Sequence, residues 1–170
     1  MIPIQNIYYM LSYAFQILNE QGYRNIATEQ FNNTAELMAA ILEKGIANQL
    51  KRGLCKEYIP QTEALSSLRG KIDIAESIKT QSMLRKQLIC TYDEFSVNST
   101  MNQIIKSTVE LLLCSNISKK RKKNLRKLMI YFGEVDFIDL HTVNWNVQYN
   151  RNNQTYRCLL YTSDAADEED

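Results

Sequence analysis

Residues Cys90–Leu113 read CTYDEFSVNSTMNQIIKSTVELLL, and the rest of the chain is organised around this stretch. It continues a short run of strand-forming residues, Leu88–Tyr92, and then passes through an acidic turn. Thr100 offers a helix N-cap, and Gln103 three residues later completes a capping box. The residues that follow predict a helix with one buried face, because these recur at helical spacing: Met101, Ile104, Ile105, Thr108 and Leu112.

The amino-acid composition limits which class of protein this chain can be. The 170 residues suggest one domain, and a hydrophobic share of 45% is enough for a packed core. No apolar run approaches the roughly 18 residues that a membrane span needs, and no basic region precedes an apolar core at the N-terminus. The four cysteines show no CxxC pair and no histidine at metal-ligand spacing. We therefore expect a cytoplasmic protein with reduced thiols and no contact with a membrane.

The last thirteen residues, Cys158–Asp170, differ from the text before them, since they hold five acidic residues and no basic one. The string Cys158–Glu168 resembles one translated reading frame of a sequencing-library adapter. We expect residues 1–157 to form the domain, and 158–170 to be a non-native tail that adds nothing to the fold except where it mimics a missing helix. A natural acidic tail is the alternative. Without these five acids, 14 acidic residues stand against 20 Lys and Arg, so residues 1–157 carry about +6.

Further helices are expected on both sides of the central stretch. Ile4–Leu18 has apolar residues at helical spacing. A second helix is predicted to begin after an N-cap at Asn33 and to run to about Arg52, before Gly53. A short helix is predicted after Ser118.

Short strands are expected between the helices. The candidates are Leu54–Ile59, closed by Pro60, then Gly70–Ile74, and Leu88–Tyr92. Val143–Tyr149 alternates apolar and polar residues as a half-buried strand does. The sequence therefore predicts an α+β fold in which helices flank a small antiparallel sheet or partial barrel.

A dense basic run follows the central helix in the text SKKRKKNLRKL. One interpretation is a patch that contacts the phosphates of a nucleic acid, and the other is a solvated helix face. The pattern supports both equally. Its candidate nucleic-acid contacts are Lys119, Lys120, Arg121, Lys122, Lys123, Arg126 and Lys127.

No catalytic constellation is predicted. The sequence holds no GxxxxGK[ST] nucleotide loop, no GxSxG and no HExxH. The acid pairs Asp93–Glu94 and Glu134–Asp136 lack the acid-x-Lys pattern of metal-dependent nucleases, and solvated turns explain them better. We therefore expect neither a metal site nor a cofactor in this chain.

Three motifs carry a family resemblance. They are IPIQNIYYMLSYAF at Ile2–Phe15, RGKIDI at Arg69–Ile74 and TYDEFSVNSTMNQIIKST at Thr91–Thr108, and they occur in this order. The chain resembles the McrC family, the nuclease-bearing subunits of McrBC restriction systems that cut DNA containing methylcytosine. The resemblance covers about residues 2–157, and LlaJI-type restriction subunits are related to it.

The resemblance implies a division of labour. The N-terminal part of such a subunit is an α+β module that docks on a ring of McrB, a GTP-hydrolysing AAA+ partner, and stimulates hydrolysis. A separate C-terminal PD-(D/E)xK domain, absent from this chain, holds Mg²⁺ and cuts the DNA that the full complex binds. The alternative is a free-standing nucleic-acid-binding α+β domain that uses the basic run.

A docking element is predicted at Leu54–Ile74, because its short strands are punctuated by glycine and proline and carry many polar side chains. Arg69 is the leading candidate, since a guanidinium makes bidentate contacts to carboxylates. An equal alternative is that Arg69 only shapes a turn. The full set of docking candidates is Glu57, Arg69, Lys71 and Asp73.

Overall fold

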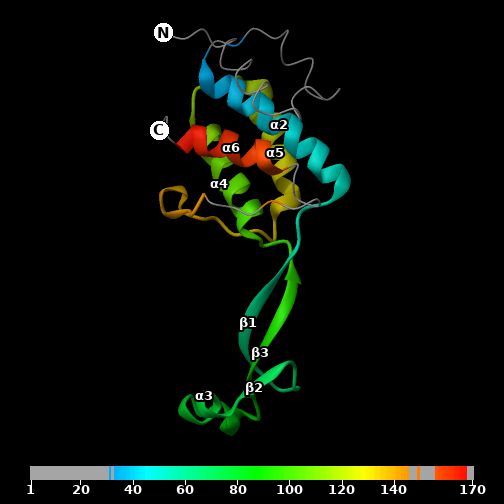
Figure 1. The fold of residues 1–170 in the computed structure, drawn as a ribbon, viewed down its shortest axis with the longest axis vertical. Coiled ribbons are helices and arrows are strands. Elements are labelled where there is room, and N and C mark those ends of the chain that lie inside the picture. Colours follow the sequence, from blue (N-terminus) through cyan, green and yellow to red (C-terminus); the bar gives the residue numbers. More distant parts are fainter. Residues whose placement is uncertain (1–30, 32, 146–148, 150–155, 168–170) are drawn as a thin grey trace. The chain divides into compact units, whose positions relative to one another are not determined.

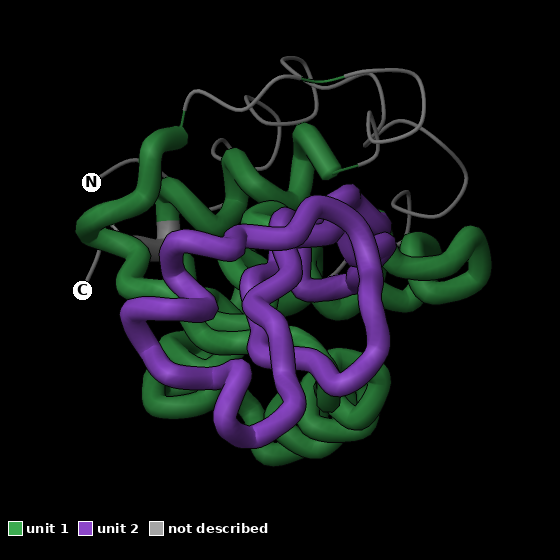
Figure 2. Tube along the Cα trace, turned by 90° about the horizontal axis from the view of Figure 1, so that it is seen from below, with its two compact units in different colours: residues 1–55, 100–170 green, residues 56–99 purple. Residues whose placement is uncertain are grey.

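The computed structural model describes residues 31, 33–145, 149 and 156–167, and these form two compact units (Figures 1 and 2). Unit 1 comprises Met1–Cys55 and Thr100–Asp170, and unit 2 comprises Lys56–Ser99. The fold is α+β, as predicted: helices build unit 1, and a small antiparallel sheet builds unit 2. The expected helix at Ile4–Leu18 lies outside the described residues.

Helix α2, Thr34–Arg52, confirms the predicted second helix. The Asn33 side chain caps it by accepting a hydrogen bond from the Glu36 backbone N–H at 2.7 Å. The helix ends at Gly53, whose φ of +92° suits a residue without a Cβ. Its buried face includes Leu37, Ile41, Leu42 and Ile46.

Helix α4, Thr100–Cys114, is the predicted central helix, and its five predicted face residues are all buried. Helix α5, Lys119–Met129, follows the Ser118 cap and buries Leu125. Both pack against α2, as does the C-terminal helix α6, Tyr156–Asp167 (Figure 1). Apolar faces of these helices therefore form the core of unit 1.

Helix α6 crosses the domain boundary that we expected after residue 157. It packs on α2 and α4, and its buried side chains include Cys158, Leu159 and Leu160. Burial raises the pKa of the Cys158 thiol to about 12. The segment thus takes the place of a core helix, which is the exception that our expectation of a tail without a part in the fold allowed for.

A buried polar cluster connects the start of α6 to the start of α4. The Tyr156 hydroxyl donates to Asn102 Oδ1 at 2.7 Å and accepts from the Cys55 N–H at 2.8 Å. Asn102 Nδ2 donates to the Cys55 carbonyl at 2.8 Å. These bonds fix the backbone at the last residue of unit 1 before the chain enters unit 2.

Unit 2 is a three-stranded antiparallel sheet in the order β1-β3-β2. Its strands are β1 (Glu57–Leu65), β2 (Lys71–Asp73) and β3 (Leu88–Ser96). Helix α3 (Ile74–Lys79) and the 3-10 helix η3 (Ser82–Arg85) connect β2 to β3. The sheet is open, so the partial-barrel alternative does not apply.

Two predicted strand ends were wrong. Pro60 does not close β1 but lies within it opposite Asp93, which is tolerated because β1 is an edge strand. The expected acidic turn at Asp93 and Glu94 is part of β3, since pairing with β1 carries the strand through to Ser96.

The segment after α5 contains the 3-10 helices η4 (Ile130–Phe132) and η5 (Leu140–Thr142). Residues 143–145 are not a strand, contrary to the predicted alternation, and residues 146–148 of that expected strand lie outside the described residues. The alternation of apolar and polar residues in this segment did not produce a strand, because no described strand pairs with residues 143–145. In the part of the chain that the structure describes, no helix is long and apolar enough to span a bilayer.

Candidate functional site

Gly70 sets the path of the chain into β2. Its φ of +66° is a conformation that L side chains rarely adopt. A Cβ at this position would lie 2.4 Å from the Thr91 carbonyl oxygen and 2.7 Å from the Tyr92 Cβ. Only glycine lets the backbone approach β3 this closely, so the RGKIDI and TYDEF motifs pack against each other here.

Arg69 lies over the ring of Tyr92, with its Cζ atom 4.0 Å from the ring centroid. The Tyr92 hydroxyl in turn donates a hydrogen bond to Glu63 Oε2 at 3.2 Å. Within the described chain, the exposed Arg69 guanidinium forms no ion pair or hydrogen bond. Stacking therefore restrains the guanidinium plane while its N–H donors face solvent.

The interaction with Glu63 also affects the Tyr92 phenol. Desolvation is the largest cause that raises the pKa of Tyr92, and the negative charge of Glu63 raises it further. The raised pKa extends to higher pH the range in which the phenol is protonated and can donate to Glu63. Sequence reasoning missed both residues, because β1 was expected to end at Ile59 and Glu63 then had no strand partner.

The other predicted docking residues do not form one cluster with Arg69. Lys71 is exposed and pairs with Thr91 in the sheet. Asp73 is occupied as the N-cap of α3, because its side chain accepts a hydrogen bond from the Glu76 N–H at 3.0 Å. Glu57 pairs with Ser96, five positions farther along β3 than Thr91, which is about 17 Å along the strand.

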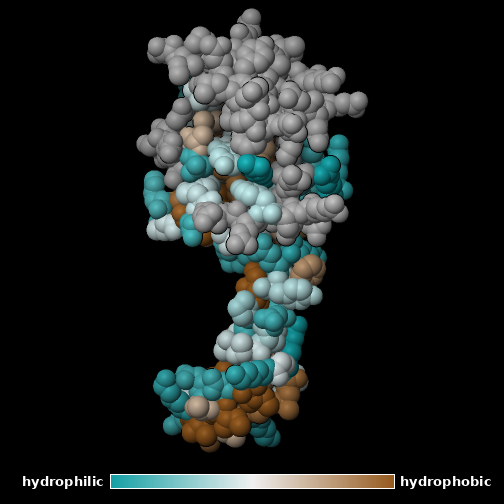
Figure 3. Space-filling model, viewed as in Figure 1, coloured by the Kyte–Doolittle hydropathy of each residue, from teal (hydrophilic) through white to brown (hydrophobic). Residues whose placement is uncertain are grey.

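Unit 2 also exposes large apolar side chains that sequence reasoning did not single out. We call four of them the α3–η3 apolar surface, and their exposed fractions are Ile74 61%, Ile78 62%, Met83 52% and Leu84 82%. Brown side chains gather over the α3 end of unit 2 in Figure 3. Contiguous exposed apolar surface of this kind marks an interaction site more often than a scattered apolar residue does.

Helix α5 separates its seven cations into two groups. Arg121 points inward and forms ion pairs with Glu36 and Glu43, each at 2.9 Å. Glu43 also accepts a hydrogen bond from Asn124 at 2.8 Å. The remaining six cations are exposed or half-buried, and we call them the α5 outer face: Lys119, Lys120, Lys122, Lys123, Arg126 and Lys127.

The carboxylate of Glu36 holds α2 and α5 together. It accepts hydrogen bonds from the Ser118 backbone N–H at 2.7 Å and from the Ser118 hydroxyl at 2.8 Å, as well as from Arg121. Burial by itself would raise the pKa of Glu36, but these hydrogen bonds outweigh burial and lower the pKa. Glu36 therefore remains ionised and anchors the start of α5.

The described residues hold no group of three or more histidine, cysteine or acidic side chains that could bind a metal. Asp93 and Glu94 are successive residues of β3, so their side chains point to opposite faces of the sheet and cannot chelate one ion together. Glu134 and Asp136 are both exposed.

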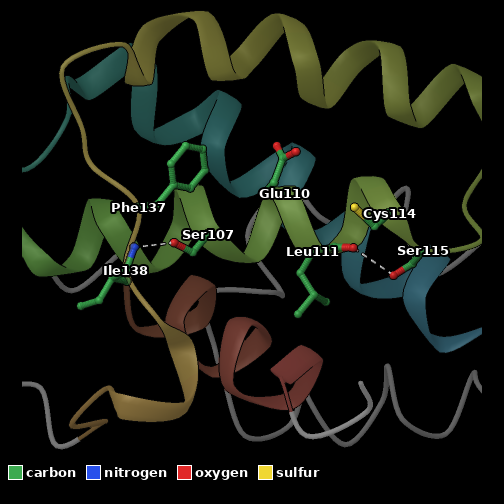
Figure 4. A pocket seen from close by; sticks show the side chains of 7 residues that line it. All are labelled: Ser107, Glu110, Leu111, Cys114, Ser115, Phe137 and Ile138. Carbon is green, nitrogen blue, oxygen red and sulfur yellow. Dashed lines mark hydrogen bonds between the residues drawn. The ribbon is translucent and has the colours of Figure 1, made fainter.

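A shallow pocket of about 430 Å³ lies between α4 and residues 137–138 (Figure 4). Glu110 and Cys114 are one helical turn apart on α4, but no histidine lines the pocket. The Ser107 hydroxyl already accepts a hydrogen bond from the Ile138 N–H at 2.9 Å. The pocket thus lacks the pairing of nucleophile and base that covalent catalysis needs.

The comparisons with known proteins agree with the motifs. Residues 5–164 match the family model described as "McrBC 5-methylcytosine restriction system component". This chain belongs to the McrBC family. A curated member, the type IV methyl-directed restriction enzyme EcoKMcrBC of Escherichia coli K12, is 33% identical over 132 residues. That alignment covers 75% of this chain and 38% of the relative, so the chain spans well under half of that protein.

Solved structures of McrBC assemblies share the fold. The cryo-EM structure of the Thermococcus gammatolerans McrBC complex matches with a TM-score of 0.67 at 22% identity, over 95% of this chain and 50% of the other. A half-complex from the tetradecameric assembly of McrB AAA+ hexamers with bound McrC, from the same organism, matches with a TM-score of 0.65 at 20% identity. It covers 88% of this chain and 39% of the other.

Proposed function

We propose that this chain is the partner-docking part of an McrC-like subunit, which binds a ring of McrB-like AAA+ GTPase subunits in the cytoplasm and stimulates their GTP hydrolysis. The family match over residues 5–164 carries the proposal. The shared fold supports it, since one solved neighbour holds McrB AAA+ hexamers with bound McrC.

Unit 2 has the surface that docking requires. Its α3–η3 apolar surface is exposed, and the exposed Arg69 guanidinium stacks on Tyr92 without an ion pair or hydrogen bond to any other described residue. Buried apolar contacts supply most of the energy of a protein interface, and arginine is enriched among the residues that dominate binding. We therefore assign the ring contact to unit 2, with Arg69 and Lys71 as its polar contacts.

DNA cleavage is assigned elsewhere in the subunit. The proposal places Mg²⁺-dependent hydrolysis in a nuclease domain of the full-length protein, where carboxylates would hold the metal that activates water. No described residue is given a catalytic role, so the 170-residue chain is expected to leave methylated and unmethylated DNA intact in the presence of Mg²⁺. Mg²⁺-dependent cutting that Asp93→Ala abolishes would contradict this assignment.

The decisive experiment is Arg69→Ala, assayed with a cognate McrB-like GTPase. We expect stimulation of GTP hydrolysis at a fixed, subsaturating concentration to fall about tenfold, which corresponds to ~1.4 kcal/mol and to the loss of a charge-assisted contact. Arg69→Lys, which keeps the charge but not the planar fork, is expected to recover only part of the stimulation.

Arg52→Ala is the matched control, because Arg52 is an exposed arginine at the end of α2 in unit 1. It should stimulate the GTPase as the unmodified chain does. Full stimulation by a folded Arg69→Ala variant would place the contact outside this residue. If the unmodified chain bound no GTPase at all, the proposed function itself would fail.

A further inference from the structure

Helix α5 carries its charges against the electrostatic preference of a helix. The N-terminal turn of a helix favours acidic side chains, yet α5 begins Lys-Lys-Arg-Lys and contains no acid. Cations four positions apart, such as Lys119 and Lys123 or Lys123 and Lys127, also repel each other. Helix stability alone does not account for this arrangement, which points to a partner that supplies negative charge.

The six cations of the α5 outer face lie on one side of the helix. At 100° per residue, they occupy an arc of about 160°, whereas Arg121, Asn124 and Leu125 lie opposite. The face extends about 12 Å from Lys119 to Lys127 at 1.5 Å per residue. Among the described residues, none of the six forms an ion pair.

The inner side of α5 packs against the rest of unit 1, so the helix that carries the outer face is held in place. Leu125 is fully buried, and Arg121 is neutralised by Glu36 and Glu43 of α2. Glu36 and Glu43 form their ion pairs with Arg121, and these three groups together carry a net charge of −1, so the six outer cations keep a large net positive charge. The charge on this face is therefore available to a partner.

The chemistry of the face favours a nucleic-acid backbone over a membrane. A helix that binds a membrane surface inserts its apolar side, but Leu125 on the apolar side of α5 is fully buried in unit 1. Five of the six cations are lysines, which contact phosphates as point charges and lack the fork that reads guanine. Contacts of this kind bind the duplex without reading its sequence.

We propose that the α5 outer face binds the phosphate backbone of duplex DNA without regard to sequence or methylation. Duplex DNA carries one charge per ~1.7 Å of axis, so a 12 Å face spans about seven phosphates, of which roughly half lie on the near side. The face should therefore neutralise about three or four phosphates. This inference stands independently of the proposed docking on a GTPase ring.

The test is fluorescence anisotropy of a labelled 20-base-pair unmethylated DNA duplex with the full 170-residue chain, between 50 and 200 mM salt. For the unmodified chain, the slope of log K against log salt is expected near −3, since each contact contributes about −0.9. The triple variant Lys123→Gln, Arg126→Gln, Lys127→Gln should bind at least tenfold more weakly at 50 mM salt, with a slope less negative by up to about 2.7, which is about 0.9 for each lost contact.

The matched control removes three exposed cations outside α5: Lys51→Gln, Arg52→Gln and Arg85→Gln. This control variant should keep the salt slope of the unmodified chain and its affinity within about twofold. Equal losses in both triple variants would mean that total charge, not the α5 outer face, drives binding, and would overturn the proposal. Should the α5 triple variant fail to fold, Lys123→Gln alone serves, with a slope less negative by about 0.9.

Competitors separate the sources of negative charge. Unlabelled duplex DNA should displace the probe, and comparable displacement by duplex RNA would support recognition of the phosphate backbone. Failure of excess unlabelled duplex DNA to displace the labelled duplex would contradict a saturable DNA site. Binding of poly-glutamate with no measurable binding of either duplex would show that the face takes an acidic protein instead.

Discussion

Unit 1 buries the apolar faces of α2, α4 and α6 against one another, whereas unit 2 leaves most of its large apolar side chains in solvent. Within Lys56–Ser99, all of which the structure describes, the buried hydrophobic residues are Ile89 and Cys90 alone. The same 44 residues expose Tyr58, Leu68 and Phe95 in addition to the α3–η3 apolar surface.

This difference in burial suits unit 1 to stabilise the chain and unit 2 to bind a partner. A unit of that size buries too little surface to be strongly stable alone, so backbone pairing and local contacts must hold it. Regions with few buried apolar contacts belong to the low-stability end of a protein, from which binding elements are drawn. Unit 1, in contrast, is expected to carry most of the stability of the chain.

The largest expected effect is in the core of unit 1. Leu159→Ala should lower the free energy of unfolding by about 3 kcal/mol, because Leu159 is 1% exposed between helices and its loss leaves a cavity. At about 2–4 °C per kcal/mol for a chain of this size, the melting temperature should fall by about 6–12 °C.

Tyr161→Ala on the same helix is the control, since Tyr161 is 46% exposed and should shift the melting temperature far less. Equal, small shifts in both variants would show that α6 does not support unit 1 and that residues 158–170 are dispensable for the fold.

A smaller effect, confined to unit 2, is expected for Gly70→Ala. The new Cβ would meet the Thr91 carbonyl and would also force a strained φ, for about 2–3 kcal/mol in total. Hydrogen exchange of the β2 and β3 amides should accelerate accordingly, while exchange in α4 remains unchanged.

Gly53→Ala is the control for Gly70→Ala, because it introduces backbone strain without a steric clash. Gly53 also has a positive φ, of +92°, but nothing lies within 4 Å of a Cβ built there. It should therefore cost only the strain of its backbone, about 1–3 kcal/mol, and should leave the pairing of β2 with β3 intact. A Gly53→Ala variant that accelerates exchange of the β2 and β3 amides as much as Gly70→Ala does would refute the close approach of Gly70 to β3.

The smallest effect depends on pH and concerns the contact between α2 and α5. The folded-state pKa of Glu36 is lowered, so the carboxylate stabilises the fold above its unfolded pKa near 4.5, and this contribution is lost as pH falls through the folded-state pKa. Glu36→Gln should lower the free energy of unfolding by about 1–2 kcal/mol at pH 7.

Thermal melts from pH 7 down to pH 3 provide the measurement. The gap between the unmodified chain and Glu36→Gln should narrow below about pH 4.5 as Glu36 becomes protonated in both states. Glu110→Gln is the control, because Glu110 is exposed on α4. A gap that stays constant with pH would mean that the ionised form of Glu36 adds nothing to the fold.

Local sequence signals determined the helices of unit 1. Capping residues such as Asn33 and Ser118 and the helical spacing of apolar residues act within one or two turns, so the sequence alone predicts where α2, α4 and α5 begin. The three motifs in order likewise sufficed to indicate the family that the comparisons confirm. The basic run was also visible, but its division into Arg121 and the outer cations was not.

Only the tertiary structure decided what depends on pairing between distant residues. Strand β3 continues through Asp93 and Glu94 because β1 pairs with it, and no local pattern encodes that register. The stacking of Arg69 on Tyr92 and the ion pairs of Arg121 join residues far apart in sequence. The incorporation of Cys158–Asp167 into a core helix has the same cause, since its buried side chains pack on α2 and α4, which are distant in sequence.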